Sequence, residues 1–116
     1  MTKYHARAVN LDGYRFASQA EAARYRELKL LEQAGKIMGL LVHPRYRLDV
    51  NGVKICDYEA DFAFQTSLGA QLVVEDVKGI RTPVYKLKRK LMYARYSIEI
   101  TEIDAAQYRT RTRSKR

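Results

Sequence analysis

The dipeptide Asn51-Gly52 lies between two runs rich in β-branched and aromatic residues, 40–50 and 53–64. Asn-Gly readily adopts the positive φ angles of a two-residue hairpin turn. The two runs are therefore predicted to be antiparallel strands joined by that turn. This pairing constrains the fold strongly, because every other element must pack on or beside the hairpin.

A helix is predicted ahead of the hairpin, over residues 18–34. Ser18 and Glu21 form the S-x-x-E arrangement that caps a helix N-terminus, and strong helix formers follow until Gly35. A second helix is predicted to begin at Pro83, since proline suits the first position of a helix. Apolar residues recur there at helical spacing, so its buried face is expected to consist of Val84, Leu87, Leu91 and Ala94.

Two more strands complete the predicted fold. One covers about 71–78, before the second helix, and the other lies within 96–103, after it. The order α-β-β-β-α-β predicts an α/β (α+β) sandwich with a mixed β-sheet flanked by helices. The 116 residues are expected to form one domain, 1–116, with a basic and flexible tail at 108–116.

The positive charge of the chain is concentrated in its C-terminal third. Residues 1–77 contain ten Lys plus Arg and ten Asp plus Glu, whereas residues 78–116 contain twelve basic and three acidic residues. Such a one-sided field suits a polyanion. Nucleic acid is favoured over an anionic membrane because no lipidation motif or long amphipathic helix is present. The alternative is a charge bias that only improves solubility.

Several other classes of protein are disfavoured. No run of about 18 apolar residues predicts a membrane span, and the N-terminus lacks the apolar core of a signal peptide. A cytoplasmic location is therefore expected. The single Cys56 cannot form an internal disulfide, and the separated His5 and His43 do not have the spacing of zinc ligands.

Three charged residues interrupt the apolar strand run 73–79, VVEDVKG. Successive side chains of a strand point to opposite faces, so Asp76 and Lys78 are expected to be neighbours on one face and Glu75 to lie on the other. Upstream, Asp61 stands between two apolar residues of the hairpin. Burying such an acid is costly unless a cation compensates its charge.

Two carboxylates and a lysine that converge would form an oxygen-rich site for a small divalent cation. Mg²⁺ prefers a few carboxylates and keeps several waters, which leaves room for a phosphate oxygen and an attacking water. A neighbouring lysine can polarise that water and stabilise charge on the scissile phosphate. From spacing alone, the alternative stays open that Asp61, Asp76 and Lys78 form an ordinary ion-paired patch on the solvent face of a sheet.

The capped helix, the acid at Asp61 and the acid-x-Lys motif at 76–78 together resemble the PD-(D/E)xK nuclease superfamily. The match covers about 16–103. Within the superfamily, the chain is similar to small archaeal-type Holliday junction resolvases and phage-encoded endonucleases. One departure is Ala60, which stands where that superfamily has proline. The resemblance implies a restriction-endonuclease-like core and DNA hydrolysis that depends on Mg²⁺, with Mn²⁺ as a substitute.

The resemblance also implies roles for particular residues. By position, Glu21, Asp61 and Asp76 take the metal-binding and catalytic roles, and Lys78 assists the nucleophile. Glu75 is the other candidate acid, but the family spacing and the strand alternation both favour Asp76. Glu21 has a structural explanation as well, because an acid at the third helical position caps the backbone.

The basic residues are expected to bind the DNA backbone without reading its sequence. Phosphate contacts position a duplex but carry no sequence code, so recognition by branch shape is expected. The residues predicted to contact DNA are Lys86, Arg89 and Lys90 on the second helix, and Arg109, Arg111 and Arg113 in the tail.

The sequence hypothesis is thus a metal-dependent, structure-selective DNA endonuclease that cuts four-way junctions. The resemblance implies a homodimer, since two strands must be cut symmetrically, acting in the cytoplasm or, for a viral chain, in the cytoplasm of the host cell. Two alternatives stay open. One is a phage restriction-like or nicking endonuclease for other DNA, and the other is a non-catalytic DNA-binding module on the same fold.

Overall fold

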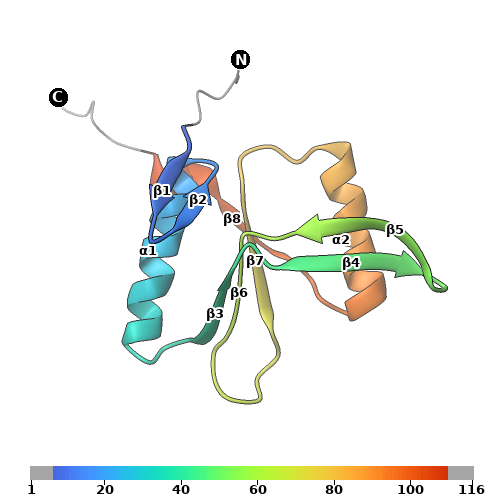
Figure 1. Ribbon diagram of the computed structural model, residues 1–116, viewed down its shortest axis with the longest axis horizontal. Coiled ribbons are helices and arrows are strands. Elements are labelled where there is room, and N and C mark those ends of the chain that lie inside the picture. Colours follow the sequence, from blue (N-terminus) through green and yellow to red (C-terminus); the bar gives the residue numbers. More distant parts are fainter. Residues whose placement is uncertain (1–6, 110–116) are drawn as a thin grey trace.

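The computed structural model describes residues 7–109 and contains two α-helices and eight strands within them. The helices are α1 (Gln19–Gln33) and α2 (Pro83–Tyr96), and a short 3-10 helix, η1 (Ala105–Tyr108), follows the last strand (Figure 1). None of the helices in this range is long and apolar enough to cross a membrane. The strands are β1 (Val9–Leu11), β2 (Tyr14–Phe16), β3 (Met38–Val42), β4 (Arg45–Val50), β5 (Val53–Glu59), β6 (Phe62–Gln65), β7 (Val73–Lys78) and β8 (Thr101–Asp104).

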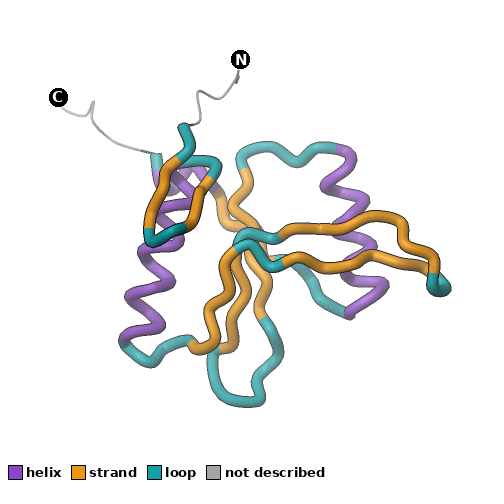
Figure 2. The backbone as a smooth tube through the Cα atoms, viewed as in Figure 1, coloured by secondary structure: helices purple, strands orange, loops and turns teal. Residues whose placement is uncertain are grey.

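A four-stranded sheet in the order β3-β6-β7-β8 forms the centre of the molecule. The pairs β3/β6 and β6/β7 are antiparallel, and β7/β8 is parallel, so the sheet is mixed as predicted. Figure 2 shows α1 on one side of this sheet, and α2 with the two-stranded β4–β5 ribbon on the other side. The expected α+β fold class is confirmed.

The sheet separates two apolar cores, and β7 contributes to both. Its side chains alternate as predicted: Val74 packs in the core beneath α2, whereas Val73 and Val77 pack in the core beneath α1. The buried residues of the α1 core are Phe16, Ala22, Tyr25, Leu28, Ile37, Phe62 and Phe64. Those of the α2 core are Leu48, Tyr58, Ala60, Ala63, Val74, Tyr85, Met92 and Ile100.

Each of the two long β runs is broken into two strands, so the predicted order α-β-β-β-α-β was incomplete. The first run divides at His43-Pro44 and the second at Ala60-Asp61. The breaks face each other, because the His43 N–H donates to the Asp61 carbonyl and the Ala60 N–H donates to the Pro44 carbonyl, each at 2.9 Å. Proline has no N–H for a sheet ladder. The outer half of the hairpin therefore leaves the main sheet as the β4–β5 ribbon.

Two hairpin turns depend on positive φ angles. Asn51 and Gly52, with φ of 51° and 82°, join β4 to β5 as predicted. Asp12 and Gly13, with φ of 53° and 83°, join β1 to β2 in an N-terminal hairpin that was not predicted. Asp-Gly is a hairpin dipeptide like Asn-Gly, but the strands beside it are only three residues long.

The buried face of α2 differs from the predicted one. Val84 and Leu87 remain 63% and 59% exposed, and Ala94 is also exposed, so of the predicted face only Leu91 is partly buried. The residues that α2 buries are Tyr85 and Met92. Tyrosine faces the sheet because its ring and its hydroxyl meet charged groups of β7 and β8, a contact that an aliphatic side chain does not offer.

Candidate active site

Asp61, Asp76 and Lys78 lie together where β5 passes into β6 alongside β7. The Asp61 carboxylate accepts a hydrogen bond from the Val77 N–H, with an N–Oδ2 distance of 2.7 Å. Lys78 Nζ is 3.4 Å from Asp76 Oδ2. All three charged side chains line one cavity of about 350 Å³. The break at Ala60-Asp61 is what brings the Asp61 side chain to the strand that carries the other two.

Glu21 reaches the same region from the first turn of α1. Its N–H donates to Oγ of Ser18, the N-cap residue, at 3.1 Å, and its Oε1 accepts from the N–H of Ala17, just before the cap, at 3.0 Å. Its other oxygen, Oε2, points to His43 Nε2 at 2.9 Å. Glu21 therefore supports the capped start of α1, and one of its ligand atoms lies within 4.8 Å of ligand atoms of His43 and Asp61.

The two aspartates are held in an environment that disfavours their charge. Burial, followed by the negative charge of Glu21, raises the pKa of Asp61 to about 6. Burial, followed by the charge of Asp61, raises the pKa of Asp76 to about 7. Asp76 is only 4% exposed. Carboxylates that are close, desolvated and incompletely compensated by one lysine favour the binding of a cation.

The raised pKa of Asp76 predicts how stability depends on pH in metal-free protein. Its folded pKa of about 7 lies above the ordinary 3.8, so the folded state holds this proton more tightly than the unfolded chain does. The contribution of Asp76 to the free energy of unfolding therefore decreases as the pH rises from about 4 to about 7. The Asp76→Asn protein does not titrate at this position, and we expect it to gain about 1–3 kcal/mol of unfolding free energy over the wild type across that range.

Urea unfolding with chelator present, at a series of pH values, measures this difference. Groups that do not interact with Asp76 titrate alike in both proteins and cancel, so the difference reports on Asp76 and on its neighbour Asp61. Asparagine keeps a carbonyl that accepts the hydrogen bond from Tyr58, so the change isolates the charge. A difference between the two proteins that does not change with pH would contradict the placement of Asp76 in a charge-disfavouring site.

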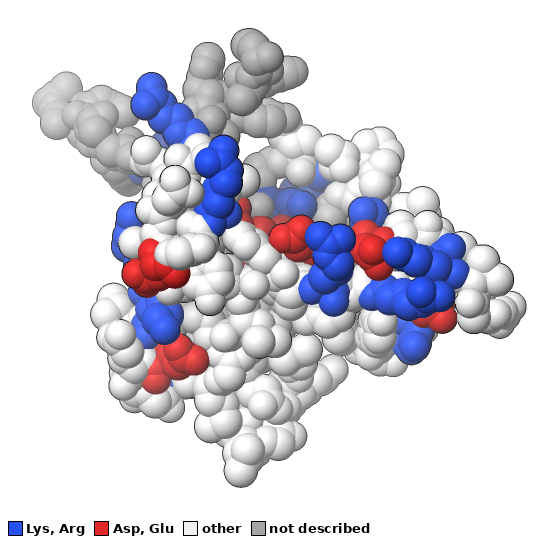
Figure 3. All heavy atoms as spheres, viewed as in Figure 1, with Lys and Arg blue, Asp and Glu red and all other residues white. Residues whose placement is uncertain are grey.

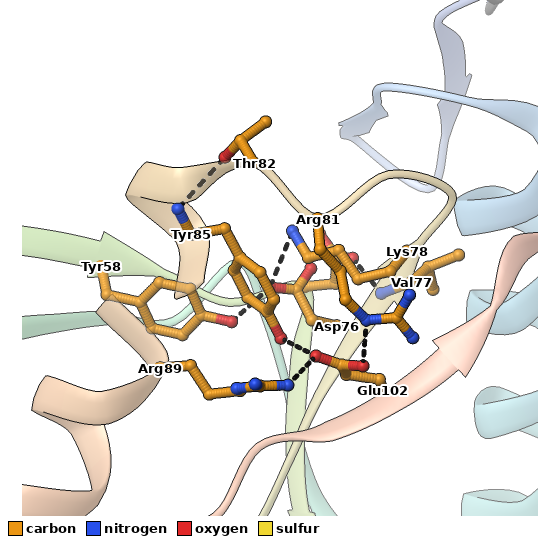
Figure 4. Close-up of polar contacts among 10 residues, drawn as sticks. Tyr58, Asp76, Val77, Lys78, Arg81, Thr82, Tyr85, Arg89 and Glu102 are labelled. Carbon is orange, nitrogen blue, oxygen red and sulfur yellow. Dashed lines mark hydrogen bonds and ion pairs between the residues drawn. The ribbon is translucent and has the colours of Figure 1, made fainter. Parts of the chain in front are cut away.

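Lys78 is positioned by an aromatic ring and a small charged network behind it. Its Nζ lies 3.8 Å from the centroid of the Tyr85 ring. The Tyr85 hydroxyl donates to Glu102 Oε2 at 2.8 Å, and the same carboxylate binds Arg81 and Arg89 at 2.6 and 2.8 Å (Figure 4). The ammonium group is thus held at the side of Asp76 by α2 and β8.

Tyr58 is a site residue that the sequence reasoning missed. Its hydroxyl donates to Asp76 Oδ2, as Figure 4 shows. Burial, followed by the charge of Asp76, raises the pKa of Tyr58 well above its ordinary range, so the phenol stays protonated. A protonated phenol fixes one oxygen of Asp76 and leaves the other for a ligand. In the sequence Tyr58 stands between Asp57 and Glu59, and that stretch contains no motif that signals such a role.

Glu75 lies on the opposite face of β7, toward α1. Arg24 of α1 binds it with two parallel hydrogen bonds, from Nε to Oε1 at 2.8 Å and from Nη2 to Oε2 at 2.6 Å. Glu27 binds the same arginine at 2.9 Å and accepts the hydroxyl of Tyr108 at 2.5 Å. The Glu75 side chain is therefore an anchor for α1, on the opposite face of β7 from Lys78.

The basic residues predicted to contact DNA have different surroundings. Lys86 and Lys90 are exposed on α2, and Arg109 is exposed beside η1. Arg89 is half-buried and bound to Glu102, so it is less free than predicted. Arg111 and Arg113 lie outside the described residues, as does most of the predicted basic tail.

A further lysine, Lys88, enters the site from α2 and lines the cavity with Asp61, Asp76 and Lys78. The sequence reasoning did not select it. Figure 3 shows other basic side chains over the β4–β5 ribbon, with carboxylates between them. Those of Arg45 and Lys54 pair with Asp57, so the ribbon is less basic than its arginines and lysines suggest.

His43 is the other residue that the structure brings to this region. The separation of the two histidines in sequence predicted no zinc cluster, yet the bend after β3 places His43 against Glu21 and near Asp61. One ligand atom from each of the three residues lies within 4.8 Å of the others. Because the bend was not predicted, sequence spacing could not reveal this grouping.

A family model described as "Protein of unknown function (DUF1064)" matches residues 1–110 of the chain. The match spans both α-helices and all eight strands of the described residues. No curated protein and no solved structure matches the chain.

Proposed function

We propose that this chain, which belongs to the DUF1064 family, is a metal-dependent DNA endonuclease that cuts branched duplexes. The observation that carries the proposal is the pair of aspartates, half-buried Asp61 and buried Asp76, with raised pKa values beside Lys78. Perturbed carboxylates next to a cationic side chain in a cavity are typical of catalytic sites. The arrangement agrees with the PD-(D/E)xK resemblance in sequence.

The donor set fits a hard divalent cation such as Mg²⁺, with Mn²⁺ as a substitute. Asp61 and Asp76 would hold it, since both are oxygen ligands that line one cavity and gain from a neighbouring positive charge. Glu21 is close enough to Asp61 to add a third carboxylate. When bound, the cation supplies Lewis-acid polarisation of a phosphate oxygen and lowers the pKa of a water.

Other side chains would stabilise the developing charge, orient Asp76 and bind the phosphate. Lys78 Nζ would hydrogen-bond the attacking water or the phosphate and offset the charge that develops there. Tyr58 keeps Asp76 in one orientation by donating to Oδ2. Lys88, on the α2 side of the cavity, would hold a phosphate oxygen of the bound strand.

DNA is the proposed partner because the chain carries a formal net charge of +9. Helix α2 contains five Lys or Arg and no Asp or Glu, and its Lys86 and Lys90 are exposed. A duplex lying across α2 would bring its backbone to the cavity that Lys88 borders. We place this activity in the cytoplasm, or in the cytoplasm of the host cell for a viral chain.

The proposed substrate is the four-way Holliday junction, cut by a homodimer, as the resemblance to archaeal-type resolvases implies. Two active sites related by two-fold symmetry would cut two strands at matching positions. Backbone contacts carry no sequence information, so the shape of the branch would decide where cutting occurs.

A junction with mobile arms tests this proposal. We expect paired, symmetric nicks with Mg²⁺, none with chelator, and at least about tenfold slower cutting of the linear arms alone, a difference of about 1.4 kcal/mol in the barrier. Equal cutting of junction and arms would instead indicate a restriction-like or nicking endonuclease. Binding without any cutting, with Mg²⁺ or Mn²⁺, would indicate a non-catalytic DNA-binding module.

A further inference from the structure

A second group of side chains that carry metal-ligating atoms shares Asp61 with the cavity that holds Asp76 and Lys78. It consists of Glu21 from the start of α1, His43 from the bend after β3, and Asp61 from the bend before β6. One ligand atom from each lies within 4.8 Å of the other two. Three separate parts of the chain supply these groups, so the grouping arises from the fold and not from local spacing.

The imidazole of His43 is directed at the carboxylates by its surroundings. Its Nε2 is 2.9 Å from Glu21 Oε2, and its ring packs against Phe16 with a centroid distance of 5.5 Å. The His43 N–H donates to the Asp61 carbonyl at 2.9 Å, which ties the bend to the second acid. The side chains of His43 and Glu21 are 24% and 7% exposed.

We propose that His43 is a metal ligand, and that Glu21, His43 and Asp61 select a divalent first-row transition ion over Mg²⁺. Mg²⁺ is held in proteins almost entirely by oxygen, whereas imidazole nitrogen favours transition ions. The two carboxylates supply the oxygen donors that Mn²⁺ also accepts. This donor set differs from the all-oxygen pair of Asp61 and Asp76.

The inference rests on the proposed function for the purpose of the ion, but not for its ligands. Asp61 belongs to both groups, so an ion held with His43 would adjoin the pair that we propose acts on the phosphate. The competing explanation is that His43 only hydrogen-bonds Glu21 and fixes the capping acid. The two explanations differ in whether a bound ion touches the imidazole nitrogen.

Mn²⁺ binding to the full chain without DNA separates them. Electron spin echo modulation of bound Mn²⁺ detects nitrogen-14 in a directly bound imidazole, and we expect that signal in the wild type. The chain has two histidines, so His5→Gln is the matched control and should keep the signal. His43→Asn should lose it, and asparagine suits this position because it tolerates the φ of 57°.

Affinity gives a second readout. We expect His43→Asn to weaken Mn²⁺ binding by roughly 10- to 100-fold. The electron spin resonance signal of free Mn²⁺ measures this binding. The affinity for Mg²⁺, measured by competition, should change by less than about threefold. If His43→Asn does not fold, the His5→Gln protein labelled with nitrogen-15 histidine decides, because His43 is then the one labelled residue and must change the modulation pattern if it binds Mn²⁺.

Bound Mn²⁺ without a nitrogen signal, or no Mn²⁺ binding at all, would overturn the ligand assignment. Failure of the proposed nuclease function looks different. A signal that depends on His43, with no DNA cleavage in any metal, supports the ligand and rejects the nuclease. Cleavage with Mg²⁺ and no nitrogen signal rejects the ligand and supports the nuclease.

Discussion

The Asp76→Asn protein is expected to bind a four-way junction as tightly as the wild type and to cut it roughly 1000-fold more slowly. Asp76 is the buried member of the aspartate pair that lines the cavity, and asparagine removes its charge while keeping its size. The Tyr58 hydrogen bond can persist to the amide carbonyl. A loss of about 1000-fold corresponds to about 4 kcal/mol of transition-state stabilisation.

Single-turnover cleavage of a labelled junction at saturating Mg²⁺ measures the rate, and fluorescence anisotropy with chelator measures the affinity. Asp57→Asn is a suitable control, because Asp57 pairs with Lys54 on the ribbon and does not line the cavity. It should change neither quantity by more than about threefold, as expected for a surface substitution. An Asp76→Asn protein that cuts at the wild-type rate would contradict the mechanism.

The elements that the sequence predicts well are those with local signals. Helix α1 begins at Gln19, one residue after the predicted start, and Ser18 caps it by accepting a hydrogen bond from the Glu21 N–H. Asn51-Gly52 makes its hairpin turn because the dipeptide itself adopts the required φ angles. The alternation of β7 follows from backbone geometry alone, so the opposite placement of Glu75 and Asp76 was predictable.

The features that the sequence did not reveal depend on contacts between distant segments. The breaks at His43-Pro44 and Ala60-Asp61 support each other through two hydrogen bonds. Pro44 is a local signal for the first break, whereas the second run contains no proline or glycine that would indicate its break. The β-rich composition of both runs favours continuous strands, and tertiary pairing overrides it. His43 was passed over as a ligand for the same reason.

The prediction of the buried face of α2 was wrong for another reason. Counting aliphatic residues at helical spacing selected Val84 and Leu87, which remain exposed. Tyr85 was not counted, although its ring covers the ammonium of Lys78 and its hydroxyl reaches Glu102. The contacts of Tyr85 with charged groups of the candidate site, together with the burial of Met92 in the core, thus set the rotation of α2 about its axis.

Glu75, the third charged residue of the VVEDVKG strand, connects α1 to the strand of the candidate site. Arg24 and Glu75 join α1 to β7, and Glu75 immediately precedes Asp76. Glu21 and Arg24 are three residues apart and therefore project from neighbouring positions of the helix surface. The ion pair thus fixes the end of α1 that carries Glu21 against the strand that carries Asp76.

Replacing Arg24 with alanine is expected to destabilise the protein by about 3–5 kcal/mol, because Glu75 would stay buried without its cation. Glu75 is 3% exposed, and among the described residues Arg24 gives its carboxylate both of its hydrogen bonds. Urea unfolding of wild type and variant measures the loss. Arg26→Ala, an exposed change on the same helix, should cost no more than about 0.5 kcal/mol.

The double variant with leucine at both Arg24 and Glu75 should recover most of the stability, since an apolar pair leaves no buried charge unpaired. It should not restore cleavage fully, because leucines do not reproduce the two directed hydrogen bonds that set the position of α1. If the Arg24→Ala protein is as stable as the Arg26→Ala protein, the ion pair between Arg24 and Glu75 does not anchor α1. A double variant that is stable and cuts at the wild-type rate would show that Glu21 does not need this anchor to reach Asp61.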